Sequence, residues 1–162
     1  MILEFCDWLQ ETAVSVAIRE STLMFPVLEG SHLLALGASA GAIAISDLRM
    51  MGVIFRKQRV DHVFDQVFPW MFVGFLFMFI TGVFLFWSEP MRCYESIWFR
   101  YKMLFIVFGV INAGIYEITL RKRVTEWGHL ESPPAGAKFA GAFSILVWAL
   151  VIITGRTMAY NF

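Results

Sequence analysis

Glu29 and His32 stand three residues apart in a segment that is otherwise apolar, so they share one face of a helix. A neutral imidazole can bind a metal through one ring nitrogen while the other nitrogen bonds a neighbour. His32 is therefore a candidate ligand to the iron of a b-type haem or to copper, with Glu29 as the acceptor for its second nitrogen. The alternative without a metal is a histidine that bonds Glu29 or a neighbouring backbone group.

A carboxylate in this position needs a cation nearby, because an ionised group inside a membrane costs about 2.5–3.5 kcal/mol. Arg156, near the end of the sequence, is the candidate partner of Glu29. Lys102 reaches a similar depth in another apolar segment, and Tyr160 follows Arg156 by one helical turn. We therefore expect Glu29, His32, Lys102, Arg156 and Tyr160 to form a polar cluster near one membrane surface.

A haem held by His32 needs another axial ligand or an open coordination position. His62 and His129 fall in predicted loops on the opposite side of the membrane. The other ligand would then be a methionine, Met158 or Met24, or a histidine from another chain. The candidate cofactor-binding residues are His32, Glu29, Met158 and Arg156.

Copper is the alternative metal, because Cu(I) prefers thioether and thiolate ligands. Met91 and Cys93 are close in the sequence, and Met24 and Met158 fall near the ends of spans on the same side. Cys6 belongs to that side as well. Cys6 and Cys93 could form a disulfide in an oxidising compartment or remain free thiols, and no CxxC pair indicates a redox motif.

Another set of polar residues falls at the opposite ends of the apolar segments. Glu117 and Arg121 are four residues apart, which is the spacing of a helical ion pair. Asn112 falls in the middle of a segment, where an amide normally bonds a neighbouring helix. We interpret this set as structural, with a proton path as the alternative. It includes Asp47 and Arg49 at the end of the first span.

The elements that position these residues are membrane spans. The chain has 162 residues, of which 59% are hydrophobic and only 16% charged. Its mean hydropathy is +0.68 and its net charge is zero, and no basic patch suggests nucleic acid. About 20 apolar residues suffice to cross a bilayer as a helix. The sequence predicts an all-α, antiparallel four-helix bundle with spans at about residues 23–46, 67–87, 98–120 and 139–160.

The first 22 residues are predicted to form a different element. Ile2, Phe5 and Leu9 recur at helical spacing, while Glu4 and Asp7 fall on another face. This pattern is typical of an amphipathic helix that lies in the membrane interface. The expected organisation is thus an interfacial helix over residues 1–22, followed by a transmembrane domain over residues 23–162.

Small residues at four-residue spacing indicate where helices approach each other closely. Gly37 and Gly41 form a GxxxG in the first span, and the third and fourth spans carry Gly109 with Ala113 and Ala137 with Gly141. We interpret all of these as packing inside the bundle, with a dedicated face for oligomer contacts as the alternative.

The basic residues predict the orientation of the chain, because cytoplasmic loops carry an excess of Lys and Arg. Of the 13 Lys and Arg residues, eight fall on the side of the loops that follow the first and third spans, and five fall on the other side. This distribution predicts that both termini are periplasmic in a bacterial inner membrane.

The sequence resembles a bacterial family of four-span inner-membrane proteins of unknown function. That family is distantly similar to bundles of the copper-resistance D and cytochrome b561 type, which implies haem or copper. The resemblance also implies a histidine at the position of Glu117, where this chain departs from it. The matching stretches are Ile18–Ser21, Phe25–Pro26, Glu29 with His32–Leu34, Asp47–Arg49, Pro69–Trp70, Lys102, Asn112–Ala113, Gly155–Arg156 and Ala159–Tyr160.

The functional prediction is a small membrane subunit that binds haem b through His32 and passes electrons or supports a partner enzyme. The alternatives are a structural or assembly subunit without a cofactor and a copper-handling membrane protein. The predicted loops are too short for an extramembrane catalytic domain, so we expect no catalysis by the chain alone. We expect the lipid bilayer as surroundings, and either a homo-oligomer or a partner membrane subunit.

Overall fold

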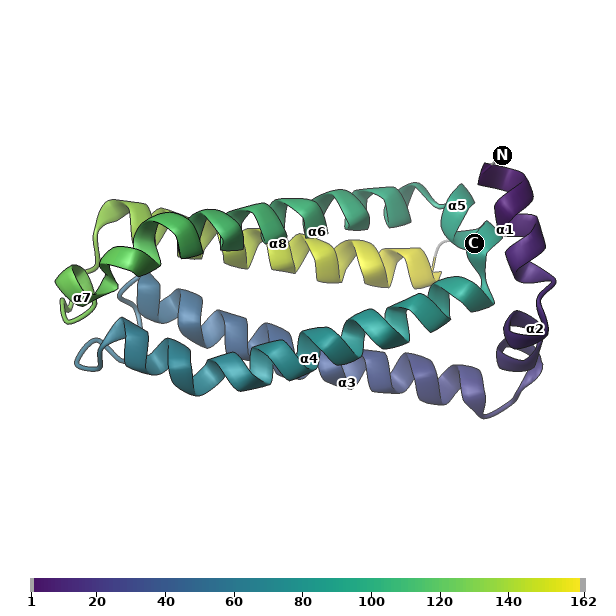
Figure 1. Cartoon of the computed structure of the whole chain (residues 1–162), viewed down its shortest axis with the longest axis horizontal. Helices are drawn as coiled ribbons and strands as arrows, with labels where there is room; N and C mark the ends of the chain where they lie inside the picture. Colours follow the sequence, from purple (N-terminus) through teal and green to yellow (C-terminus); the bar gives the residue numbers. More distant parts are fainter. Residues whose placement is uncertain (1, 161–162) are drawn as a thin grey trace.

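The computed structural model describes residues 2–160 and contains four long helices that run along its longest axis (Figure 1). They are α3 (Met24–Met50), α4 (Val60–Ser88), α6 (Ile97–Ile115) and α8 (Ala135–Tyr160). Each is long and apolar enough to cross a membrane, α6 together with the turns that follow it. The described part of the chain has no strand. The predicted all-α, four-helix, multi-pass membrane protein is therefore confirmed.

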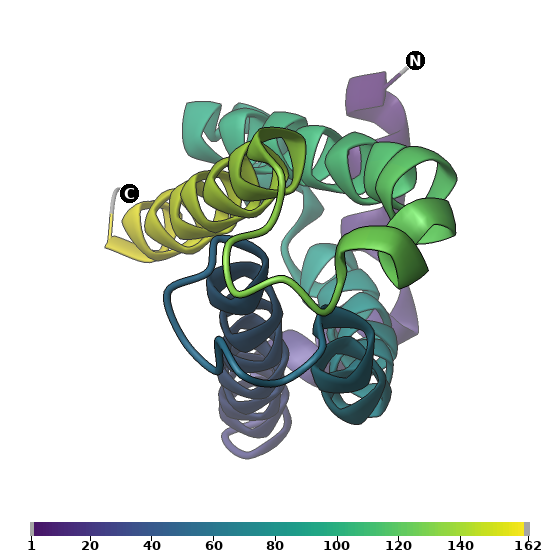
Figure 2. The ribbon, with the colours of Figure 1, turned by 90° about the vertical axis from the view of Figure 1, so that its left-hand side faces the viewer.

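Consecutive long helices run in opposite directions and form two hairpins, α3 with α4 and α6 with α8 (Figures 1 and 2). Contacts between α3 and α8 join the two hairpins. Both ends of the described chain lie at the same end of the bundle, which we call the N-terminal end (Figure 1). The opposite end holds the loops at residues 51–59 and 128–134, and we call it the loop end.

The helices extend beyond the apolar segments at the loop end. α3 continues to Met50 instead of ending near residue 46, and α4 begins at Val60 instead of residue 67. With 29 residues, α4 is about 43 Å long, whereas the hydrocarbon core is about 30 Å thick. Backbone hydrogen bonding continues into the headgroup region, so polar turns extend each helix. His62 consequently lies in the first turn of α4 and not in a loop.

The third span changes its winding near the loop end. A π-helical turn, η1 (Tyr116–Leu120), follows α6 directly, and a 3-10 turn, η2 (Arg121–Arg123), and the short helix α7 (Val124–Trp127) complete the segment. Tyr116 is buried there, with its ring 6.1 Å from that of Phe64 on α4. Tyr116, Phe64 and Trp127 belong to the main apolar core, which closes the loop end.

The N-terminal region forms two helices where the sequence predicted one. α1 (Ile2–Gln10) and α2 (Ala13–Glu20) are separated at Thr12. The Thr12 hydroxyl donates to the carbonyl of Leu9 at 2.7 Å and accepts from the backbone N–H of Ser15, so it caps α2. The indole N–H of Trp87 also donates to this hydroxyl at 2.9 Å. The break therefore fixes the N-terminal region to the end of α4.

A further short helix, α5 (Pro90–Glu95), was not predicted. It follows α4 at the N-terminal end and packs against α1 (Figure 1). Together α1, α2 and α5 cover this end of the bundle. Ile2 and Trp8 of α1 remain 67% and 61% exposed, which suits a helix in the membrane interface.

Small residues bring α3 close to its two neighbours. A methyl group at Gly74 of α4 would lie 2.8 Å from Cβ of Ser39, and one at Gly141 of α8 would lie 2.8 Å from the carbonyl oxygen of Asp47. The packing role predicted for Gly141 is confirmed. The same role predicted for Gly37 and Gly41 is wrong, because added methyl groups there would meet no described atom within 4 Å. These two glycines face outward from α3.

Candidate functional site

His32 lies at the contact between α3 and α4, with one ring nitrogen held by a hydroxyl. Its Nδ1 is 2.8 Å from Oγ1 of Thr81, and the same hydroxyl oxygen lies 2.8 Å from the carbonyl of Phe77 and 3.3 Å from that of Met78. In the tautomer with its hydrogen on Nδ1, the imidazole donates to the hydroxyl, the hydroxyl donates to a carbonyl, and Nε2 keeps its lone pair. That tautomer is the one in which Nε2 can bind a metal.

The surroundings of His32 include residues of α4 and α6, and the α6 residue in turn contacts α8. The ring lies 3.4 Å from the position of an added methyl group at Gly82 of α4. Lys102 of α6 is close enough for its charge to act on His32. The Lys102 side chain in turn lies 3.7 Å from the methyl position of Gly155 on α8. We call His32, Thr81, Gly82, Lys102 and Gly155 the His32 cluster.

The expected cluster around Glu29 is not present as predicted. Arg156 is exposed, donates to the hydroxyl of Tyr160 at 2.8 Å and lies 5.2 Å from the centre of that ring. His32 bonds Thr81 instead of Glu29. Within residues 2–160, Glu29 is half-buried and makes no hydrogen bond or ion pair. The structure thus brings Lys102 to His32 but leaves Glu29 and Arg156 unpaired with each other.

The sulfur-containing residues at the N-terminal end separate into two places. Met91 and Met158 line a cavity of about 570 Å³ among α1, α2, α5 and the helix ends. Cys6 and Cys93 are the buried cysteines of α1 and α5, and both are free thiols. Burial, with a smaller contribution from Glu89, raises the pKa of Cys93 to about 11. The thiol therefore stays protonated near neutral pH, and it is not among the residues that line the cavity with Met91.

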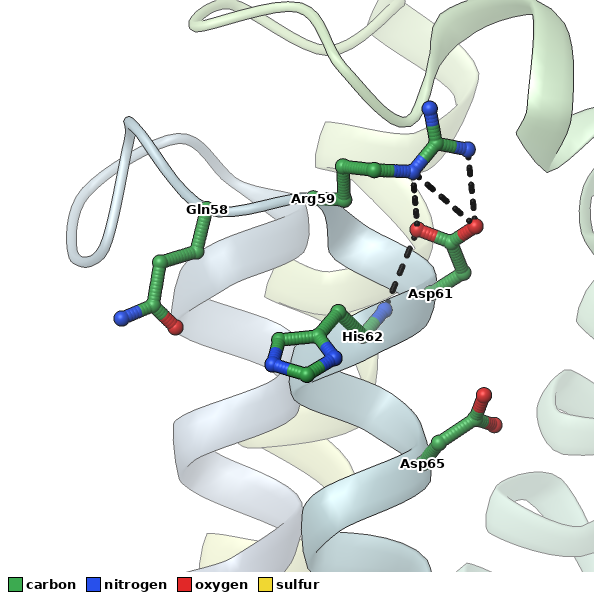
Figure 3. A pocket seen from close by; sticks show the side chains of 5 residues that line it. All are labelled: Gln58, Arg59, Asp61, His62 and Asp65. Atoms are coloured by element: carbon green, nitrogen blue, oxygen red, sulfur yellow. Dashed lines mark hydrogen bonds and ion pairs between the residues drawn. The ribbon is translucent and has the colours of Figure 1, made fainter.

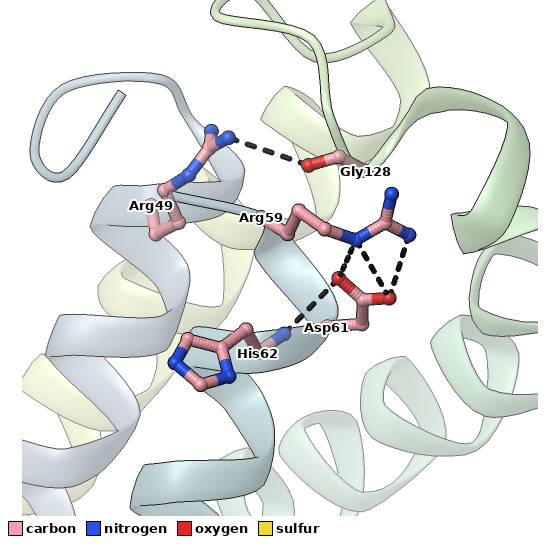
Figure 4. A network of polar contacts seen from close by, with 5 residues as sticks. All are labelled: Arg49, Arg59, Asp61, His62 and Gly128. Carbon is pink, nitrogen blue, oxygen red and sulfur yellow. Dashed lines mark hydrogen bonds and ion pairs between the residues drawn. The ribbon is translucent and has the colours of Figure 1, made fainter. Parts of the chain in front are cut away.

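Arg49 has a structural role at the loop end. Its side chain is fully buried, and its guanidinium donates to the carbonyls of Gln58 at 2.8 Å and Leu130 at 3.1 Å. A longer contact of 3.5 Å reaches the carbonyl of Gly128, as Figure 4 shows. One side chain of α3 therefore ties together the two loops that close this end of the bundle.

Asp47 is buried nearby but does not pair with Arg49. The carboxyl is 5% exposed and lies next to Ser144 of α8, and its Oδ2 has no partner among the described residues. The remaining members of the predicted structural set make conventional contacts. Glu117 and Arg121 form an ion pair of 2.6 Å, and the Asn112 amide donates to the carbonyl of Ala140 across to α8 at 3.2 Å.

A polar pocket at the loop end was not predicted. Gln58, Arg59, Asp61, His62 and Asp65 line a cavity of about 500 Å³ at the start of α4 (Figure 3). Arg59 and Asp61 form an ion pair of 2.8 Å, and this hydrogen-bonded contact raises the pKa of Arg59 above its ordinary value. His62 bonds Gln66 at 3.0 Å. Across residues 2–160, no three His, Cys, Asp or Glu side chains converge as a metal site.

Three residues that line this pocket are spaced in the sequence as on one side of a helix. Asp61, His62 and Asp65 recur within one turn, but the predicted start of α4 at residue 67 placed them in a loop. Arg19 and Glu95, which border the cavity at the N-terminal end, carried no such signal. They are far apart in the sequence and line one cavity only because α2 and α5 both pack against α4.

Comparison with known proteins identifies a family but no activity. No curated protein and no solved structure matches the chain. Residues 11–161, which include the break at Thr12 and all four spans, match one family along their whole length. The chain therefore belongs to the family of unknown function DUF6644.

Proposed function

We propose that this protein is a small membrane subunit that binds b-type haem through Nε2 of His32 and takes part in electron transfer or supports a partner enzyme. The observation that carries the proposal is the hydrogen bond between His32 and Thr81. The contact holds the ring in one orientation, as the other nitrogen of a metal-bound histidine is usually held, and the proposal uses the tautomer whose hydrogen is on Nδ1 and whose lone pair is on Nε2.

His32 would supply the ligand nitrogen to a haem. Gly82 lets the imidazole ring pack closely against α4, because an added methyl group there would lie 3.4 Å from the ring. Lys102 supplies a cation in an apolar span, where it would compensate the charge of a propionate. No other histidine of the described chain belongs to this cluster, since His62 bonds Gln66 at the loop end. A further ligand to the iron would then be a methionine or a histidine of another chain, or the iron would keep an open position.

The residues of the cluster would each have a limited task. When bound, haem supplies a reversible one-electron carrier. Thr81 would fix the tautomer of His32, and the long apolar helices would keep water from the site. In this proposal His32 is occupied as a ligand and Lys102 as a counter-charge, so the role of the cluster is to hold and insulate a redox group.

An absorption spectrum tests the proposal directly. Protein produced with ample haem should show a Soret band, and His32→Ala should abolish it. His62→Ala and His129→Ala are matched controls that remove a histidine at the loop end and should leave the band unchanged. Thr81→Val should lower haem affinity by about 10- to 100-fold while Thr81→Ser retains it, since only the valine removes the acceptor for Nδ1–H. Wild-type protein that stays colourless would end the haem proposal.

A structural or assembly subunit is the other candidate function. It is favoured by the use of polar side chains as links between elements, such as Arg49 with the two loops and Asn112 with α8. Under this proposal His32 links α3 to α4 through Thr81, and His32→Ala lowers the stability of the bundle with no change in the visible spectrum. Thermal unfolding in detergent, recorded beside the spectrum, separates the two functions.

A further inference from the structure

The cavity at the N-terminal end lies where a bilayer presents its headgroups. It has a volume of about 570 Å³ and is bordered by α1, α2, α5 and the last or first turns of α4, α6 and α8. These turns are the ends of membrane-spanning helices, so the cavity opens at the level of the interface. Its size falls within the range of ordinary small-molecule sites, about 300–1,000 Å³.

Two opposite charges border this cavity without neutralising each other. Arg19 comes from α2 and Glu95 from α5, and within residues 2–160 neither makes a hydrogen bond or ion pair. The other ionised groups of the lining do pair, since Arg92 and Glu89 form an ion pair of 2.8 Å. The cavity therefore offers one available cation and one available anion, with no net charge.

The remaining lining is suited to the apolar part of a lipid. Met91, Trp98 and Met158 contribute flexible and aromatic surface, and Ile97 adds an aliphatic side chain. Tryptophan in particular favours the boundary between headgroups and acyl chains. Beyond the cavity, the outer faces of the spans are apolar and exposed, for example Phe79 at 72%, so acyl chains can follow them into the bilayer.

We propose that this cavity binds the headgroup of a zwitterionic phospholipid with a primary ammonium group, as in phosphatidylethanolamine. Arg19 takes the phosphate and Glu95 takes the ammonium, while Met91, Trp98 and Met158 contact the glycerol and the first acyl carbons. Charge complementarity selects this occupant. An anionic lipid such as phosphatidylglycerol would offer Glu95 only neutral hydroxyl groups and no cation, and a choline headgroup has no N–H to donate to it.

Native mass spectrometry of the whole protein in mild detergent tests the proposal, with phosphatidylethanolamine, phosphatidylcholine and phosphatidylglycerol added separately. We expect the ethanolamine lipid to bind with the highest occupancy. Arg19→Ala and Glu95→Ala should each weaken its binding about tenfold, because each removes a hydrogen bond to a charged group. Arg100→Ala is the matched control, since Arg100 is an exposed arginine at the same end that bonds the carbonyl of Tyr94 and does not line the cavity.

Glu95→Lys gives a gain-of-function test that does not depend on loss of binding. The substitution leaves two cations and no free anion at the cavity, so the preference should change from phosphatidylethanolamine to phosphatidylglycerol. Circular dichroism and the unfolding temperature should match the wild type for every variant compared. Equal binding of the three lipids by the wild type would overturn the proposal. So would an Arg19→Ala or Glu95→Ala variant that binds as the wild type does, or a Glu95→Lys variant with an unchanged preference.

Discussion

Arg49 is fully buried although it is charged, and it obtains its partners from the backbone. Carbonyl groups of two separate loops accept hydrogen bonds from its guanidinium. These carbonyls take the place of the water molecules that would otherwise solvate the charge. The sequence indicated a polar residue at the end of a span and a structural role. It could not name the partners, because Gln58 and Leu130 contribute backbone oxygens, which carry no signal in their residue types.

The arrangement predicts a large effect for removal of this side chain. Arg49→Ala should lower the free energy of unfolding by about 3 kcal/mol or more, because the carbonyls of Gln58 and Leu130 lose their donor in a buried place. The exposed Arg59, which pairs only with Asp61, is the control, and Arg59→Ala should change stability by less than about 1 kcal/mol. Denaturant unfolding in detergent micelles measures both. Equal effects of the two substitutions would contradict the role of Arg49.

Cys93 shows how burial controls reactivity at the residue scale. Its pKa rises from an ordinary value of 9.0 to about 11, so the folded protein disfavours the thiolate. The rate of alkylation of Cys93 by a maleimide in the folded protein should therefore stay low at pH 8 and increase up to about pH 11. Because the folded pKa is raised, the contribution of the neutral thiol to stability is complete below pH 9 and is lost as the pH rises toward 11. Cys6→Ser provides a chain in which only Cys93 can react, and unfolded protein should react rapidly at pH 8.

At the scale of elements, the four spans follow from the sequence because lipid requires about 20 apolar residues in a row. The ends of the helices do not follow, since polar turns outside the hydrocarbon extend α3 and α4 toward the loop end. The break at Thr12 and the helix α5 depend on tertiary contacts such as the bond from Trp87 to Thr12. The His32 cluster combines residues from all four long helices. His32 and Lys102 could be selected from the sequence as polar groups in apolar spans, whereas Thr81, Gly82 and Gly155 could not.

Glycine positions give a test of the packing between elements. Gly74→Leu should destabilise the protein by about 1–3 kcal/mol, because even a methyl group there would lie 2.8 Å from Cβ of Ser39 on α3. Gly37→Leu is the matched control within α3, where an added methyl group meets no described atom within 4 Å. Thermal unfolding of the two variants in the same detergent compares them. A Gly37→Leu variant as unstable as Gly74→Leu would show that the outer face of α3 is covered by another chain.

At the scale of the whole molecule, an even number of spans places both ends of the chain on one side of the membrane. The fold has the same arrangement, because α1, α2 and the end of α8 lie at one end of the bundle (Figure 1). The fold alone does not give the direction, because a bundle of this kind can be inserted either way. The prediction of direction rests on the basic residues. The loop end carries eight of the 13 Lys and Arg residues, and a cytoplasmic surface retains such residues during insertion.

We therefore predict that the loop end is cytoplasmic and that both termini are on the outer side. Reporter enzymes that are active only outside the cytoplasm should be inactive when fused after residue 60 and active when fused at the C-terminus. Replacing Arg56, Lys57 and Arg59 with glutamine should weaken this orientation, because the difference between the two sides would fall from eight against five to five against five. Glutamine at Arg19 and Arg92 should leave it unchanged, since that removes charge only from the outer side. If the reporter fused after residue 60 of the unmodified chain were active, the assignment would be reversed, and the cavity at the N-terminal end would lie at the cytoplasmic surface.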